Sequence, residues 1–222
     1  MRRRLPIASA IVTTLALATL PGCGGSAGGS GDGATASPTS AVASSAPSVR
    51  SSAPSATGYD GALLPGSLRP RGFTLTNQHG GRVSLSAVRG KVTILTFLYT
   101  SSKTTAPLIA QQIRGALEEL PASTPALAIS LDPTGDTPAR VRAFLRAASL
   151  TSRMEYLTGS AAQLSPVWRA YTVAPASAGA VAYERGAFVL LLDKQGAPRV
   201  EFPVEELTPE GLVHDVRKLE RE

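Results

Sequence analysis

One uninterrupted apolar run constrains the fold of this chain more than any other feature. Residues Val92 to Tyr99 are nearly all apolar or β-branched, with no glycine, proline or charge among them. Strands that are buried on both faces have this pattern, and such strands form the centre of α/β sheets. The sequence therefore predicts an α/β domain built around this strand.

The loop after the strand lies where α/β folds place their chemistry. Pro107 opens an apolar-periodic segment beyond it, as proline often does at the first position of a helix. A strand that runs through a loop into a helix N-terminus is a common place for a functional site. The loop has no thiol, histidine or carboxylate, and as a candidate binding loop it offers only Ser101, Ser102, Lys103, Thr104 and Thr105.

The N-terminal segment reads as an export signal. Arg2, Arg3 and Arg4 precede an apolar stretch, and Leu20-Pro-Gly-Cys23 ends it. This pattern indicates a secretory signal peptide over residues 1–22, too short and wrongly flanked to be a transmembrane helix. Leu-x-Gly-Cys at this place resembles a bacterial lipobox, in which Cys23 is lipidated and becomes the mature N-terminus. An ordinary signal peptide that contains a cysteine is the alternative.

Residues 23–58 are predicted to form a flexible linker behind the lipidated cysteine. They are mostly Gly, Ser, Ala, Pro and Thr and cannot bury a core. As a coil they span about 30–35 Å. Residues 59–222 remain as one domain, which we expect to be extracytoplasmic and tethered by lipid to the outer face of the cell membrane.

Cysteine content and charge exclude several function classes. Cys23 is the only cysteine, so a lipidated protein has no free thiol for disulfide exchange or thiolate metal binding within one chain. Three of the 22 basic residues lie in the signal segment, which leaves 19 against 16 acidic residues, a net charge of +3. With no run of Lys or Arg, nothing indicates nucleic-acid binding.

The remaining sequence alternates strand and helix signals, as an α/β protein should. A hairpin is expected first, around residues 77–81, and a final helix after Thr208. Between them the patterns predict strands over 92–99, 126–131, 154–157, 187–193 and 198–202. They also predict helices over 107–120, over 138–148 with Thr137 as the N-cap, and from Ser160, as the N-cap, through Trp168.

This order and several local motifs resemble the Sco/SenC family, whose members have a thioredoxin-like fold with an added N-terminal hairpin. The resemblance implies copper delivery to the CuA centre of cytochrome c oxidase. It covers roughly Phe73 to the C-terminus. The matching pieces are Phe73-Thr-Leu, Val83-Ser-Leu, Arg89-Gly-Lys-Val-Thr-Ile-Leu-Thr-Phe-Leu-Tyr-Thr100, Ser130-Leu-Asp-Pro-Thr-Gly-Asp-Thr-Pro138, Tyr156-Leu-Thr-Gly159 and Phe188-Val-Leu-Leu-Leu-Asp193.

The resemblance also implies that the family's copper ligands are missing. The family pattern Tyr-Thr-x-Cys-x-x-x-Cys-Pro places its two cysteines at Ser102 and Ala106, and Pro107 keeps its place. The family's copper histidine falls at or next to Arg185. Thiolate and imidazole ligands suit copper, and hydroxyl, methyl and guanidinium groups do not replace them. We therefore expect no catalytic residue and no cofactor.

Other residues offer weaker alternatives. His79 and His214 are the only histidines, and nothing in the sequence brings them together. Ser102 and Lys103 can be read as a nucleophile and its base, but no third orienting group follows. The pair Asp132 and Asp136 is explained by a turn and a helix cap.

The sequence thus favours a membrane-anchored accessory or binding module, not an enzyme, in the assembly of a respiratory oxidase copper centre. Its partners would be an oxidase subunit or a copper-assembly protein. Two alternatives stay open. One is copper handling through non-cysteine ligands or a partner's thiols, and the other is an enzyme that uses the Ser102 loop.

Overall fold

The computed structural model describes residues 58–66, 69 and 72–222. Cys23 and the predicted signal peptide lie outside the described residues, as does all but the last position of the predicted linker. In chain order the elements are β1 (Ala62–Leu63), β2 (Thr74–Thr76), β3 (Arg82–Ser84), η1 (Leu85–Val88), β4 (Thr93–Leu98), α1 (Thr105–Glu119), β5 (Ala126–Ser130), α2 (Pro138–Ala147), β6 (Glu155–Leu157), α3 (Ala161–Ala170), η2 (Ala176–Ala178), α4 (Ala180–Gly186), β7 (Phe188–Leu192), β8 (Pro198–Pro203) and α5 (Pro209–Arg221).

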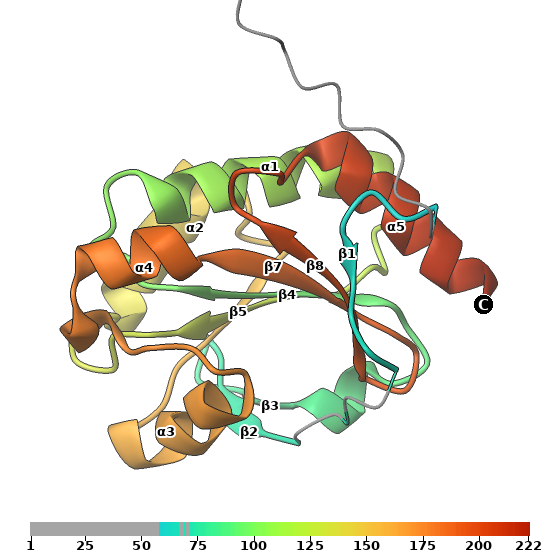
Figure 1. The fold of residues 1–222 in the computed structure, drawn as a ribbon. Coiled ribbons are helices and arrows are strands. Elements are labelled where there is room, and N and C mark those ends of the chain that lie inside the picture. Colours follow the sequence, from blue (N-terminus) through green and yellow to red (C-terminus); the bar gives the residue numbers. More distant parts are fainter. Residues whose placement is uncertain (1–57, 67–68, 70–71) are drawn as a thin grey trace, which may run out of the picture. The chain divides into compact units, whose positions relative to one another are not determined.

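The main sheet has six strands in the order β1-β8-β7-β4-β5-β6. β4, β5 and β6 run parallel, whereas β7, β8 and β1 are joined by antiparallel pairing. Every residue of β4 and β5 is buried, as the apolar runs predicted. The helices α1 and α5 pack together on one face, and α3 with the separate β2–β3 hairpin lies on the other (Figure 1).

Helix starts follow the predicted capping chemistry. Thr137 accepts a hydrogen bond from the backbone N–H of Arg140, and Thr208 accepts one from Gly211. Ser160 and Gln163 form a reciprocal capping box at α3. These caps satisfy N–H groups that the first turn of a helix leaves without partners.

Three details differ from the expectation. α1 begins at Thr105 rather than Pro107, so the proline occupies the third helical position, where its missing N–H is still not needed. The short helix α4 and the strand β1 were not predicted. α4 buries only Tyr183, so it has no apolar period to detect, and the two residues of β1 are both exposed.

Among the described residues, no helix combines the length and apolar character needed to span a bilayer.

Candidate functional site

The loop between β4 and α1 is closed by its own hydrogen bonds. The N–H of Ser102 donates to the carbonyl of Tyr99 (3.2 Å), and the hydroxyl of Ser102 accepts from the N–H of Ala106 (3.2 Å). Ser102 is only 8% exposed and Ala106 is fully buried in the first turn of α1. The side chain of Ser102 therefore stabilises the helix start instead of facing solvent as a nucleophile.

The rest of the candidate binding loop divides between surface and core. Ser101, Lys103 and Thr104 are exposed, whereas Thr105 is buried at the start of α1. Thr104 occupies the N-cap position of α1 without a side-chain cap bond. The loop thus presents one cation and two hydroxyl groups to solvent, but no metal-binding side chain.

α4 lies beside this loop (Figure 1), and a pair of tyrosines joins the two. The ring of Tyr183 in α4 meets the ring of Tyr99 edge to face, with 4.8 Å between centroids. Burial raises the pKa of the Tyr183 hydroxyl, and its oxygen has no hydrogen-bond partner among the described residues. Arg185 lies on the exposed side of the same helix. α4 thus lies near the loop. It is the segment that the resemblance aligns with the family's copper histidine, and it carries the buried Tyr183 and the exposed Arg185 there.

Asp136 is the buried anchor behind the loop. Its carboxylate accepts hydrogen bonds from the N–H of Thr100 (2.7 Å), the hydroxyl of Ser130 (2.6 Å) and the hydroxyl of Tyr156 (2.8 Å). Burial, and then the nearby Asp136 charge, raise the pKa of Tyr156. Asp136 thus joins the end of β4 to β5 and β6, a structural role wider than the turn-and-cap role read from sequence.

Asp132 keeps the local role that the sequence indicated. Its carboxylate accepts from the hydroxyl of Thr134 (3.0 Å) and the N–H of Gly135 (2.8 Å). No hydrogen bond joins the carboxylates of Asp132 and Asp136, and one is buried while the other is only half-buried. Each makes its contacts to different groups, so they do not form a catalytic pair.

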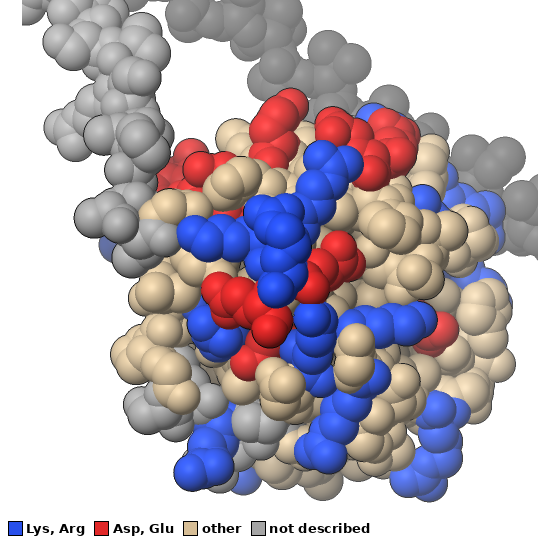
Figure 2. Space-filling model, turned by 90° about the vertical axis from the view of Figure 1, so that its right-hand side faces the viewer, with Lys and Arg blue, Asp and Glu red and all other residues tan. Residues whose placement is uncertain are grey.

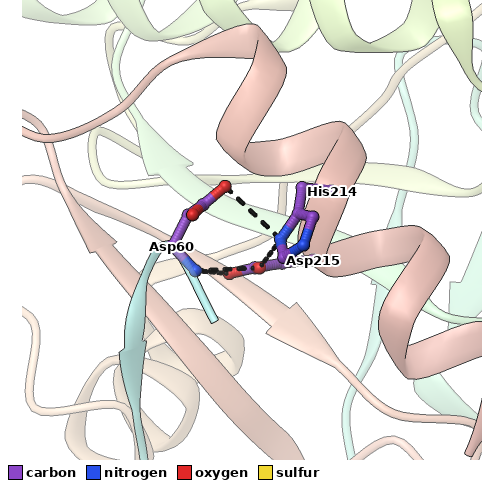
Figure 3. Close-up of side chains that lie close together, drawn as sticks. All are labelled: Asp60, His214 and Asp215. Carbon is purple, nitrogen blue, oxygen red and sulfur yellow. Dashed lines mark hydrogen bonds and ion pairs between the residues drawn. The ribbon is translucent and has the colours of Figure 1, made fainter. Parts of the chain in front are cut away.

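The two histidines lie on different elements, His79 in the turn between β2 and β3 and His214 on α5. His79 lines a surface hollow of about 570 Å³. His214 instead contacts two carboxylates: its Nδ1 lies 2.8 Å from Asp215 Oδ1 and 3.4 Å from Asp60 Oδ2 (Figure 3). Sequence reasoning missed this cluster because Asp60 is more than 150 positions away from its two partners.

The face that carries β1 and α5 has acidic and basic side chains side by side rather than a patch of one sign (Figure 2). Arg199, for example, lies between Glu222 (3.1 Å) and Asp193 (3.7 Å). Interleaved charges of this kind do not form the continuous basic surface that binds a phosphate backbone.

Comparison with known proteins identifies the family. The sequence matches the SCO1/SenC family over residues 66–221. A SCO1/SenC family lipoprotein from Bacillus anthracis superimposes with a TM-score of 0.58 at 21% identity, covering 71% of this chain and 99% of that one. Copper-bound ScoI from Bradyrhizobium japonicum gives 0.53 at 26% identity, with 68% and 98% covered. Copper-bound yeast Sco1 gives 0.58 at 19%, with 70% and 93% covered.

No curated protein sequence matches the chain significantly. The solved structures establish the predicted thioredoxin-like fold with its central sheet and flanking helices. The alignment of Ser102, Ala106 and Arg185 with the family's copper ligands stays a prediction. Since the family match spans most of the sequence and the fold agrees with it, the chain belongs to the SCO1/SenC family.

Proposed function

We propose that this protein is an extracytoplasmic, lipid-anchored accessory module in the assembly of a respiratory oxidase copper centre, without a thiol redox cycle or a thiolate copper site of its own. The family supports the setting, because one neighbour belongs to the Sco family of cytochrome c oxidase assembly proteins and another binds copper. The observation that carries the proposal is the loop after β4, where a capping hydroxyl and a buried methyl group stand at Ser102 and Ala106.

Exposed apolar side chains beside the loop support a binding role. Three large apolar side chains are exposed among the described residues: Leu63, Leu108 and Val181. Leu108 is 44% exposed in the first turn of α1, directly after the loop, and Val181 is 61% exposed on α4, the helix that contacts Tyr99 through Tyr183. Apolar groups that stay in water beside a family's functional loop fit a protein contact.

A copper titration tests the loss of copper chemistry. The full-length protein is titrated anaerobically with Cu(I) in competition with a coloured chelator. We expect no binding tighter than micromolar. A variant with Ser102→Cys and Ala106→Cys is the positive control, because soft thiolates select Cu(I). Stoichiometric tight binding by the unmodified protein would show that it handles copper itself.

A capture experiment tests the binding role. The purified copper-centre domain of a respiratory oxidase is the probe, and the readout is its retention by this protein. We expect Leu108→Asp and Val181→Asp to weaken retention. Leu63→Asp is the matched control, since Leu63 is 43% exposed but lies on β1. Equal losses in all three variants would argue against a surface around the loop.

Labelling with a fatty-acid analogue tests the anchor. The lipobox reading predicts incorporation into the full-length protein and its recovery with membranes. Cys23→Ser should abolish both. Label that remains in this variant would contradict lipidation at Cys23.

A further inference from the structure

The strongest candidate site outside the loop joins the segment before β1 to the C-terminal helix α5. Asp60 lies just before β1, and His214 and Asp215 are neighbours on α5. One ligand atom from each side chain lies within 4.8 Å of the others. Figure 3 shows the Asp60 carboxylate and the His214 ring pointing toward each other above the Asp215 carboxylate. We propose that these three side chains bind a first-row divalent cation such as Zn²⁺, which clasps the entry segment to the C-terminal helix.

The spacing of the ligand atoms suits one ion. Zn²⁺ binds imidazole nitrogen and carboxylate oxygen at about 2.0–2.2 Å, so two ligands of the same ion lie roughly 3–3.5 Å apart. His214 Nδ1 lies 2.8 Å from Asp215 Oδ1 and 3.4 Å from Asp60 Oδ2. Small side-chain rotations therefore bring all three atoms around an ion that takes the place of the proton on Nδ1.

Asp215 is held in position before any ion arrives. Its carboxylate is completely buried and accepts from the N–H of Asp60 (3.0 and 3.1 Å) and the N–H of Gly61 (2.9 Å). An ionised carboxylate has about four acceptor positions, so these bonds leave room for a metal. Because the same bonds fix the backbone of Asp60, they also hold its carboxylate near His214. Such outer contacts are what orient metal ligands.

Two of the ligands are open to water. The side chains of Asp60 and His214 are 50% and 48% exposed, so an ion can enter and keep water in its remaining positions. Two carboxylates and a neutral imidazole balance a charge of +2. Imidazole favours Zn²⁺ or Cu²⁺ over Mg²⁺ and Ca²⁺, and the absence of sulfur disfavours Cu(I).

The site has a mechanical consequence for the domain. It joins the polypeptide that enters β1 to the middle of α5, and a hydrogen bond from Lys218 Nζ to the carbonyl of Gly58 (2.8 Å) joins them a turn away. Without metal, buried Asp215 already holds the backbone of Asp60 and Gly61, but the side-chain contact between Asp60 and His214 is half exposed, and such exposed pairs contribute little to stability. The ion therefore adds a fixed side-chain link to the backbone link that exists without it.

A Zn²⁺ titration of the full-length protein tests this site, with Cys23→Ser included so that no thiol competes. Calorimetry should give one ion per chain, and the unfolding temperature should rise with Zn²⁺ because the ion binds only the folded state. We expect His214→Ala and Asp60→Ala each to weaken binding by at least about tenfold and to remove the temperature rise. His79→Ala, which alters the chain's only other histidine, should change neither.

Three outcomes would overturn the proposed metal site. The first is no stoichiometric Zn²⁺ binding, and the second is an equal loss of Zn²⁺ affinity in His79→Ala and His214→Ala. The third is Zn²⁺ binding that leaves the unfolding temperature unchanged. The result is independent of the proposed function. If Zn²⁺ does not bind, only the proposed metal site is refuted. If Cu(I) binds tightly and still binds in His79→Ala and in His214→Ala, only the proposed function is refuted.

Discussion

Replacing Asp136 tests whether the buried carboxylate holds the functional loop in place. Asp136→Ala removes the acceptor for three donors: the N–H of Thr100, the hydroxyl of Ser130 and the hydroxyl of Tyr156. The carboxylate is 3% exposed, so water does not readily replace it. The change therefore leaves buried hydrogen-bond donors without an acceptor at the point where β4 ends and the loop begins.

The magnitude follows from these bonds. Leaving a buried donor without a partner costs about 1–3 kcal/mol. The two hydroxyl groups can rotate toward other acceptors, but the backbone N–H of Thr100 cannot. Three donors without a partner would cost about 3–9 kcal/mol, and rotation of the two hydroxyl groups recovers part of this. We therefore expect Asp136→Ala to lower the free energy of unfolding by about 3–5 kcal/mol, a large part of the 5–15 kcal/mol typical of a domain. Asp136→Asn keeps one acceptor oxygen and should lose roughly half as much.

Urea denaturation at pH 7 measures the effect. Trp168 is the chain's only tryptophan and donates from Nε1 to the carbonyl of Ser130 (2.9 Å), so its fluorescence reports on this region. Asp132→Ala is the matched control in the same loop, and its half-buried, local contacts predict a loss of about 1 kcal/mol. A loss below about 1 kcal/mol in Asp136→Ala, or equal losses in the two variants, would refute the anchoring role.

Two further predictions concern the entry segment and alkaline pH. Gly61→Ala places a Cβ 2.6 Å from Val200 Cγ1 and 2.9 Å from the carbonyl oxygen of Glu201, so urea denaturation should show a loss of about 1–3 kcal/mol. Gly66→Ala, with nothing within 4 Å of the added atom, should change little, and equal losses would contradict the close approach. Burial raises the pKa of Tyr171 to about 12. Since tyrosine in the unfolded chain ionises near pH 10, the unfolded state loses the proton first, and the free energy of unfolding should fall by roughly 2 kcal/mol between pH 10 and pH 12 from Tyr171 alone. If the free energy of unfolding of Tyr171→Phe falls between pH 10 and pH 12 by as much as that of the unmodified protein, Tyr171 is not the cause.

The sequence by itself determined the elements whose signals are local. The run Val92–Tyr99 is buried throughout in the structure, because a strand covered on both faces requires side chains that can be buried at every position. Six of the eight are apolar, and the hydroxyls of Thr93 and Thr96 donate to backbone carbonyls. Thr137, Ser160 and Thr208 start their helices as predicted, because a cap is a contact between residues three positions apart. The absence of cysteine from residues 59–222 was equally a matter of sequence, because Cys23 is the chain's only cysteine.

Tertiary structure decided what depends on contacts between distant residues. Asp136 reads as a turn residue until the fold brings Thr100 and Tyr156 to its carboxylate. α4 has no apolar period of its own and is positioned by Tyr183 against the end of β4. The Asp60 and His214 cluster arises only when the segment before β1 meets α5. Such contacts leave no local pattern, since each partner alone resembles an ordinary polar surface residue.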